Sequence, residues 1–530
     1  MARGRKVTLR LVETGGDSLG GEGRSEVHIV QGRRFEAIDE AEQHLISRDP
    51  GLFQRADYVV RVAPQRLDLG AAGKVEGLRI VEVKNEHMRL RFNRACDLRK
   101  FDKRTESWIS VDCPKDFAQA YLEHMGRWQL PHLRAIATAP TLRPDGSLLS
   151  QPGYDAASGI YYDPRGVSFP EVPRAPTRDD ALAALDRLET LFATLDLVDD
   201  VSRSAALSAV MTPILRSALA AAPMHGVTAP VAGSGKSKIV NLAAILATGH
   251  PTPVIALGPR EEESEKRLGA ELIEGAPIIA IDNAVRPIGG DFLCQAITEP
   301  IVAPRLLGAS RTVKVVNAAT WYATGNNLKF VGDMVRRTLL IRLDPGCEQP
   351  ELREFEAPDP LTIARAERPV LVTAVLTIVQ AFRLAGHPRE VPALGSFGDW
   401  SRWVRDPLIW LGRPDPVLAM SEARRDDPIL GSLLAVIEQW RAVLGDQRVT
   451  CRHIAETANE HGLTGFSHGE FRDALLRVCG ENGNISTRRL GQWLGQVKGR
   501  TVAGKRLIEA ELLHGVMRWR LDFATQGLGG

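Results

Sequence analysis

The sequence has few cysteines, and they are not arranged to hold a metal or a disulfide framework. The six cysteines in 530 residues are scattered, with no CxxC pair and no cluster with histidine. This spacing supports neither a zinc site nor a disulfide-stabilised fold, so we expect reduced thiols in a cytoplasmic protein.

Long apolar segments and a strong charge excess are also lacking. No run approaches the ~20 apolar residues that a helix needs to cross a bilayer, which predicts no membrane partner. The first residues, MARGRKVTLRLVETGGDS, contain no apolar core and do not predict a signal peptide. The net charge is +2, so any nucleic-acid surface must be local.

The chain is long enough for about three domains. Its patterning predicts an N-terminal α+β domain of unknown role over 1–175, with a flexible arm over 1–24. Strands alternating with helices from about residue 225 to 344 predict a parallel sheet covered by helices. We therefore expect an α/β ATPase domain over 176–395, including an apolar lid helix near 360–385. A tryptophan-rich linker over 396–429 and a C-terminal domain over 430–530 follow.

The strongest local pattern is a phosphate-binding loop. The short apolar strand GVTAP leads into VAGSGKS, and a helical segment follows, which together predict a P-loop. Its backbone N–H groups and the helix N-terminus attract phosphates. Lys236 would reach the β- and γ-phosphates, and the hydroxyl of Ser237 would bind Mg²⁺. Pro230 stands where the motif has its first glycine, and the alternative is an ordinary glycine-rich helix entry. The expected nucleotide-binding residues are Ala232, Gly233, Ser234, Gly235, Lys236 and Ser237.

Polar residues also end two later strand patterns. The run APIIAIDNA reaches Asp282, and TWYATGNN reaches Asn326. A carboxylate beside a P-loop can hold Mg²⁺, and a polar side chain can orient the attacking water. Arg336 and Arg337 precede the strand TLLIRLD, where one of them could stabilise charge at a neighbouring subunit's site. The alternative for this pair is a solvated helix end.

The order of P-loop, IIAIDN, ATGNN and RR resembles superfamily 3 and MCM-like AAA+ helicases, most clearly over residues 200–345. More narrowly, it is similar to primase/helicase-type replication proteins of phages and integrative elements. The resemblance implies that Lys236 and Ser237 form Walker A, that Asp282 is Walker B and that Asn326 is sensor 1. Arg336 or Arg337 would be the arginine finger. It further implies ATP and Mg²⁺, a homo-oligomeric ring (a hexamer), a primase or other replication proteins as partners, and the cytoplasm of a bacterial host.

Asn283 departs from the family pattern, which places a glutamate there to activate water. An amide cannot accept that proton. Either another carboxylate acts as the base, with Glu262, Glu263 and Glu299 as candidates, or hydrolysis is slow.

Two segments carry candidate DNA-binding residues. RLLGASRTVKVV, residues 305–316, predicts a β-hairpin. The resemblance implies that this hairpin holds single-stranded DNA through Arg311 and Lys314; an ordinary surface hairpin is the alternative.

The C-terminal domain predicts three helices followed by a β-hairpin, the winged-helix plan. Residues 484–520 contain eight lysines or arginines and two glutamates, a local excess that indicates phosphate contacts with double-stranded DNA. Winged helices also dock on proteins, so that alternative stays open. The expected DNA contacts here are Arg488, Arg489, Lys498 and Lys505.

These patterns, together with the resemblance, imply an ATP-dependent DNA helicase, a ring-shaped and self-loading replicative enzyme of a phage or mobile element. The alternative is an AAA+ ATP switch that regulates or loads on DNA without unwinding it, which Asn283 favours. Residues 1–175 show neither paired metal-binding carboxylates with a histidine motif nor zinc-binding cysteines, so we do not expect primase activity there.

Overall fold

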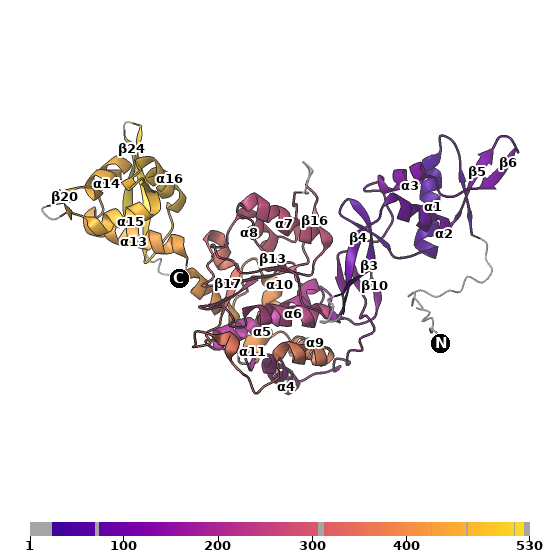
Figure 1. Ribbon diagram of the computed structural model, residues 1–530, viewed down its shortest axis with the longest axis horizontal. Coiled ribbons are helices and arrows are strands. Elements are labelled where there is room, and N and C mark those ends of the chain that lie inside the picture. The colour runs from indigo at the N-terminus through magenta and orange to yellow at the C-terminus, as the bar shows by residue number, and fades with distance from the viewer. Residues whose placement is uncertain are drawn as a thin grey trace, which may run out of the picture. The chain divides into compact units, whose positions relative to one another are not determined.

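The structure, a computed structural model, describes residues 24–68, 74–305, 312–425, 427–462, 465–513 and 515–523 (Figure 1). It divides into two units. The N-terminal unit contains the described residues up to Ala63 and those from Ile80 to Leu133, and the larger unit contains the rest. Residues 134–175 therefore belong to the larger unit, which differs from the expected boundary at 175.

The N-terminal unit packs three helices against small sheets. Phe92, Phe117 and Tyr121 form its centre, with ring planes close to perpendicular in both contacts of Phe92. One sheet has the order β1-β5-β6 and the other β2-β3-β4, and strands β3 and β4 have residues in both units. The elements are β1 (Glu26–Ile29), α1 (Arg34–Arg48), β2 (Leu52–Arg55), β3 (Tyr58–Asp68), β4 (Lys74–Glu82), α2 (Asn85–Ala95), β5 (Asp97–Asp102), β6 (Ser107–Ser110) and α3 (Lys115–Leu122).

The larger unit is built on a five-stranded parallel sheet, which confirms the predicted α/β class. The strand order is β13-β14-β17-β12-β18, and every neighbouring pair is parallel. All four residues of β14 are buried, as expected for a strand covered on both faces. The strands are β12 (Met224–Ala229), β13 (Val254–Ile255), β14 (Ile278–Ile281), β17 (Thr320–Asn326) and β18 (Thr338–Arg342).

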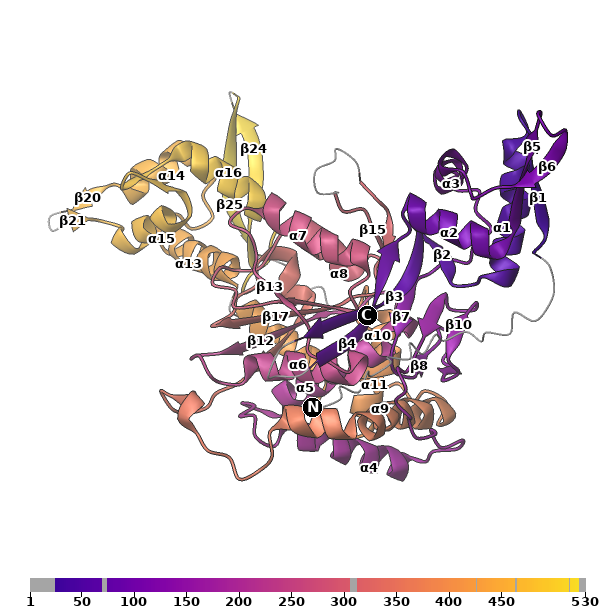
Figure 2. The same ribbon diagram turned by 45° about the vertical axis from the view of Figure 1, so that its right-hand side comes forward.

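The handedness of the crossovers decides which helices cover each face. The chain passes from β12 to β13 in one direction along the sheet and then returns through β14 and β17 in the other. Right-handed crossovers therefore place α6 (Lys236–Thr248) on one face and α7 (Glu261–Glu274) and α8 (Asp291–Thr298) on the opposite face. Both views show this arrangement (Figures 1 and 2).

A helical layer covers α6. Helix α9 (Pro360–Leu384) packs on α6 and on α4 (Arg178–Glu189), and α5 (Asp200–Leu215) packs on α6 and β18. Asp359 caps α9 by accepting from the N–H groups of Leu361 and Thr362, and it also pairs with Lys238 of α6 at 2.8 Å. The apolar segment expected near 360–385 is thus a single helix that lies against the helix of the P-loop.

Two further segments fold onto this unit. Residues 134–175 contain the short strands β7 (Ala135–Ala137), β8 (Thr141–Leu142), β9 (Leu148–Leu149), β10 (Gly153–Asp155) and β11 (Ile160–Tyr162). Thr138 donates to the carbonyls of Ala247 and Thr248 at the end of α6.

Residues 396–429 differ from the expected linker. They form α10 (Gly398–Trp400), a π-helical turn (Ser401–Arg405), α11 (Asp406–Trp410) and α12 (Ala419–Arg425). Trp400 and Trp403 are buried, and the indole of Trp400 donates to Thr212 in α5 at 3.1 Å. The tryptophans belong to the core of the larger unit because their large apolar surfaces are covered there.

The C-terminal residues from Pro428 onward have their own apolar core, centred on Trp440, Phe471, Leu490 and Trp519. The long strands β24 and β25 are antiparallel, and β19 adds a third strand beside β25. The elements are α13 (Pro428–Val443), β19 (Val449–Thr450), α14 (Cys451–Ala458), β20 (His461–Gly462), β21 (Gly465–Phe466), α15 (Gly469–Cys479), β22 (Gly480–Glu481), β23 (Asn484–Ile485), α16 (Thr487–Val497), β24 (Lys505–Leu513) and β25 (Val516–Phe523).

Across the described ranges, every helix is too short or too polar to traverse a lipid bilayer.

His225, in strand β12 between β17 and β18, makes stability depend on pH. It is fully buried, lies within hydrogen-bond distance of the Ser208 hydroxyl (2.9 Å) and stacks on Tyr322. Burial lowers the pKa of His225 to about 3. Below an unfolded-state pKa near ~6.5, the unfolded chain therefore binds a proton that the folded chain does not bind.

We predict that His225 makes the free energy of unfolding fall by up to about 1.4 kcal/mol per pH unit as pH drops below about 6.5. Above about pH 7 the imidazole is neutral in both states and contributes no pH dependence. His225→Gln should flatten this part of the profile. Urea unfolding of both proteins from pH 5 to pH 8 measures the difference, and parallel losses of stability would contradict the prediction.

Candidate functional site

The loop after β12 has the backbone shape needed to surround an anion. Gly233 and Gly235 adopt φ values of +74° and +86°, in the left-handed region that glycine tolerates. Gly235 directly precedes α6, so the loop ends at a helix N-terminus where free N–H groups and the helix dipole favour negative charge. The carboxyl edge of a doubly wound sheet is also where such folds bind ligands.

Lys236 lies inside this loop. Its ammonium donates to the carbonyl of Val231 at 2.8 Å, and the hydroxyl of Ser234 donates to the same carbonyl. Burial lowers the pKa of Lys236, and attraction to the Asp282 carboxylate opposes this shift. Ser237, the next residue of α6, is exposed. The lysine and the serine hydroxyl are thus both available at one end of the loop.

Asp282 directly follows β14 and is oriented by a residue of the neighbouring strand. The hydroxyl of Thr324 in β17 donates to Oδ1 of Asp282 at 2.6 Å and accepts from the N–H of Asn283 at 3.1 Å. Asn283 has φ +48°, which turns the chain sharply just after the carboxylate. One threonine therefore fixes both the carboxylate and the turn that presents it. The sequence pattern ATGNN contains Thr324, but its hydroxyl can reach Asp282 only because β14 pairs with β17.

Asn326 lies between the P-loop and Asp282. In the pairing of β12 with β17, Asn326 lies opposite Ala229, the last residue of β12. The N–H of Asn327 donates to the Ala229 carbonyl at 3.0 Å. With strands ~4.8 Å apart, two strand spacings put the ends of β12 and β14 about 10 Å apart. The exposed Asn326 side chain stands at the strand end between them.

Two residues that carry no sequence signal also contact the loop. A Cβ atom at Gly233 would lie 2.7 Å from Oε2 of Glu351, and one at Gly235 would lie 2.9 Å from Leu195. Glu351 follows β18 and Leu195 precedes α5, so both are distant in sequence from the P-loop. Neither belongs to a recognisable motif, because each reaches the loop only through tertiary packing.

The three carboxylates considered as a base lie in different places. Glu262 and Glu263 begin α7, directly after β13, at the same carboxyl edge as Asp282. Glu263 pairs with Arg267, whereas the described residues provide no partner for the exposed Glu262. Glu299 ends α8 next to Pro300, whose carbonyl accepts from Asn317 just before β17. Glu299 is therefore near the amino edge, away from its own P-loop.

Arg336 and Arg337 are at the amino edge as well. Arg337 immediately precedes β18, and both guanidinium groups pair with Asp333. These hydrogen bonds, first that from Arg336, lower the pKa of Asp333 to about 2. Arg336 is 60% exposed and Arg337 only 13% exposed. The length of β18, about 17 Å, separates the pair from the subunit's own P-loop.

The hairpin expected at 305–316 has its base at this same edge. Strands β15 (Ile301–Val302) and β16 (Val315–Val316) pair antiparallel, with a further bridge between Arg305 and Thr312. Lys314 is exposed on the returning strand, whereas Arg311 lies outside the described residues.

Two buried residues hold the base of this hairpin. The guanidinium of Arg216 donates to the carbonyls of Leu219, Asn317 and Ala319, at 2.5, 2.9 and 2.8 Å. Burial lowers the pKa of Arg216 to about 9, still above neutrality. The amide of Asn317 donates to the carbonyl of Ala296 in α8. Backbone carbonyls thus satisfy the buried cation, which holds the segment between the hairpin and β17, while the Asn317 amide ties that segment to α8.

The basic residues expected to contact duplex DNA fall into two groups. Arg488 and Lys505 have no ion-pair partner within the described part of the chain. Arg489 pairs with Glu481 at 3.1 Å, and Lys498 pairs with Glu509 at 3.0 Å. Exposed pairs of this kind are worth only ~0–1 kcal/mol, so a phosphate could displace the glutamates.

No family model matches the chain, and no curated protein is similar to it. Among solved structures, the apo C-terminal region of NrS-1 is 12% identical, with a TM-score of 0.30, covering 66% of this chain and 76% of that one. A JCV helicase bound to a small molecule is 11% identical, with a TM-score of 0.19, covering 45% of this chain and 74% of that one. These TM-scores are too low for either likeness to support a functional inference.

We predict that Thr324→Val weakens magnesium-dependent nucleotide binding by about tenfold, because the Thr324 hydroxyl would no longer orient the Asp282 carboxylate. The free energy of unfolding should fall by only about 1 kcal/mol. Titration of a fluorescent ATP analogue with and without Mg²⁺ measures the first effect. Thr212→Val is the matched control, since Thr212 is buried and hydrogen-bonded but contacts Trp400. Equal magnesium-dependent affinities in the two variants would refute the role of Thr324.

Proposed function

We propose that the protein is an ATP-dependent DNA helicase that works as a homo-oligomeric AAA+ ring. The observation that carries the ATPase part is the meeting of three groups at one sheet edge: the P-loop with Lys236, the carboxylate of Asp282 and the amide of Asn326. A strand order that places β17 between the P-loop strand and the Asp282 strand is typical of AAA+ sheets.

The donor set fits Mg²⁺ and ATP. Magnesium in nucleotide sites binds one or two carboxylates together with substrate phosphates, and Asp282 and Ser237 supply a carboxylate and a hydroxyl. Bound Mg²⁺ would neutralise charge on the β- and γ-phosphates. Lys236 would exchange the Val231 carbonyl for phosphate oxygens, and Asn326 would orient the attacking water.

Asn283 leaves the general base to another carboxylate. Glu262 is the better-placed of the three considered, because it lies at the carboxyl edge and has no ion-pair partner among the described residues. Slow hydrolysis without a dedicated base is the alternative, and it favours an ATP-switch regulator or loader over a helicase. Strand separation measured beside ATP turnover distinguishes these two functions.

The position of the arginine pair supports a ring. Arg336 and Arg337 lie at the edge opposite their own P-loop, so either can act as a finger only on the site of a neighbouring subunit. A closed ring gives every site such a neighbour, and the resemblance to hexameric helicases proposes six subunits.

The DNA contacts are assigned to two elements. The hairpin with Arg311 and Lys314 would grip single-stranded DNA, and its base joins α8, which follows Asp282, through Asn317. In the C-terminal region, helices α14, α15 and α16 are followed by the β24–β25 hairpin, the arrangement of a winged helix. Arg488, Arg489, Lys498 and Lys505 would bind duplex phosphates there and load the ring.

We predict that Arg336→Ala or Arg337→Ala lowers ATP turnover by about a thousandfold or more while nucleotide binding persists, because a finger acts on the transition state. Mixing such subunits with Lys236→Ala subunits should restore some turnover, since some interfaces then combine an intact P-loop with an intact finger. Arg452→Ala, an exposed arginine of α14, is the control. Rings shown to contain both subunits but lacking any recovered turnover would rule out shared sites.

We predict that Arg311→Ala combined with Lys314→Ala stops the unwinding of a pre-forked substrate but changes DNA-independent ATP turnover little. The hairpin is outside the nucleotide site, yet it would hold the threaded strand during each cycle. Lys236→Ala should abolish both activities. Normal unwinding by the hairpin variant would overturn the helicase mechanism and favour the regulator.

A further inference from the structure

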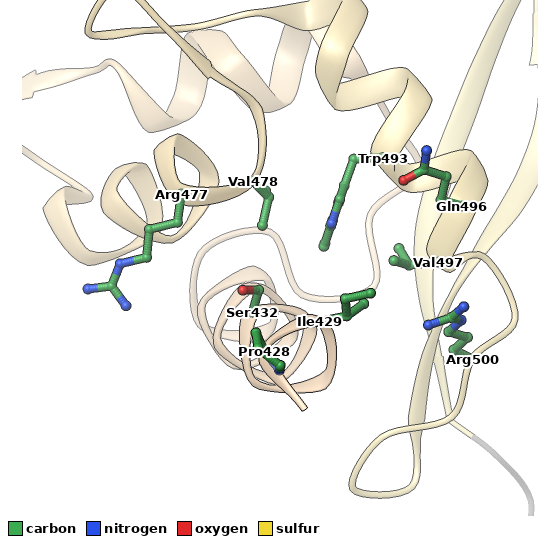
Figure 3. A pocket seen from close by; sticks show the side chains of 9 residues that line it. All are labelled: Pro428, Ile429, Ser432, Arg477, Val478, Trp493, Gln496, Val497 and Arg500. Atoms are coloured by element: carbon green, nitrogen blue, oxygen red, sulfur yellow. The ribbon is translucent and has the colours of Figure 1, made fainter. Parts of the chain in front are cut away.

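The C-terminal region contains a pocket whose lining includes none of the residues named as nucleotide or DNA contacts. Its volume is about 540 Å³, within the ~300–1,000 Å³ typical of binding sites. It lies between the start of α13, the end of α15 and the second half of α16 (Figure 3). The lining residues are Pro428, Ile429, Ser432, Arg477, Val478, Trp493, Gln496, Val497 and Arg500.

The middle of the pocket is apolar and is formed by three different helices. Ile429 comes from α13, Val478 from α15, and Trp493 from α16. Within α16, Leu490 and Leu494 face the core, while Trp493 points to the flank and is only partly buried. Apolar surfaces from three directions can enclose one inserted side chain and remove it from water.

The ends of the pocket are cationic and lack a counter-charge. Figure 3 shows Arg477 and Arg500 on opposite sides of the set of lining residues, with the apolar side chains between them. Neither guanidinium has an ion-pair or hydrogen-bond partner among the residues that the structure describes, and no acidic residue lines the pocket. The same holds for the indole N–H of Trp493. The lining is therefore rich in hydrogen-bond donors, which suits a ligand rich in acceptors.

We propose that this pocket binds an acidic segment of a partner protein, which inserts one aliphatic or aromatic side chain between two flanking carboxylates. The carboxylates pair with Arg477 and Arg500, and the inserted side chain packs on Trp493, Ile429 and Val478. A buried apolar anchor with arginines beside it is the usual composition of a strong contact between proteins.

The lining favours a peptide over single-stranded nucleic acid. A base stacks on an open aromatic face, whereas here aliphatic residues surround the single tryptophan. Two arginines of α16 are assigned to duplex phosphates. At 100° per residue, Arg488 lies about 140° around the helix from Trp493, whereas Arg489 lies about 40° from it, so contact with DNA through Arg488 leaves the pocket accessible.

The test uses the full-length protein and four fluorescein-labelled probes. One peptide has a phenylalanine flanked by aspartates. A second replaces the phenylalanine with serine, a third replaces the aspartates with asparagines, and the fourth probe is oligo-dT. Fluorescence anisotropy measures binding to the parent protein, to Arg477→Ala/Arg500→Ala and to Val478→Asp. Arg452→Ala, an exposed arginine of α14 paired with Glu456, is the matched control.

We expect the first peptide to bind about tenfold or more tightly than the second and third, and the double arginine variant to lose that advantage while Arg452→Ala keeps it. Thermal melting verifies that each variant is folded. If Val478→Asp unfolds, the double arginine variant, whose changes are at the surface, still tests the proposal. Equal binding of all three peptides would overturn the proposal. Loss of oligo-dT binding in the double arginine variant, without specific peptide binding, would assign the pocket to nucleic acid instead.

Discussion

The hydrogen bond from Thr324 to Asp282 is the contact on which the candidate ATP site depends. It crosses from β17 to the end of β14, while the other side of β17 is in register with β12 and therefore with the start of the P-loop. A single strand thus sets the separation between the carboxylate and the loop. Asn326 stands on the same strand, so the three groups form one rigid arrangement along the sheet edge.

The parallel sheet also separates two sets of candidate functional residues, one at each of its edges. The groups proposed to bind the nucleotide collect where the strands end, because the loops after parallel strands all emerge at that edge. The hairpin base, Asn317 and the arginine pair collect where the strands begin. Arg216 holds the segment between the hairpin and β17 through the carbonyls of Asn317 and Ala319, and the Asn317 amide joins that segment to α8. Under the proposed function, the arginine pair and the phosphate loop of one subunit are a strand length apart, so each site would be complete only beside a neighbour.

The residues near the P-loop differ in whether their side chains can act as the general base for ATP hydrolysis. Asn283 occupies the turn after Asp282 and its N–H is held by Thr324, but its amide cannot accept a proton. Glu351 lies against Gly233, on the phosphate loop itself, where its charge would oppose that of a triphosphate. Glu262 is at the same edge without a partner among the described residues, which leaves its carboxylate free to act.

The sequence by itself determined the parts whose chemistry is local. The P-loop, the strand ending at Asp282 and the parallel α/β sheet follow from glycine placement and from the alternation of strands and helices, which neighbouring residues specify. Tertiary structure alone decided the rest. The tryptophans of 396–429 suggested a linker, but burial of Trp400 against Thr212 makes that segment part of the core. Likewise, Leu195 and Glu351 reach the P-loop only because strand order and helix packing bring distant segments together. Such contacts leave no periodic pattern, since each partner's position is set by the whole fold and not by its neighbours in the chain.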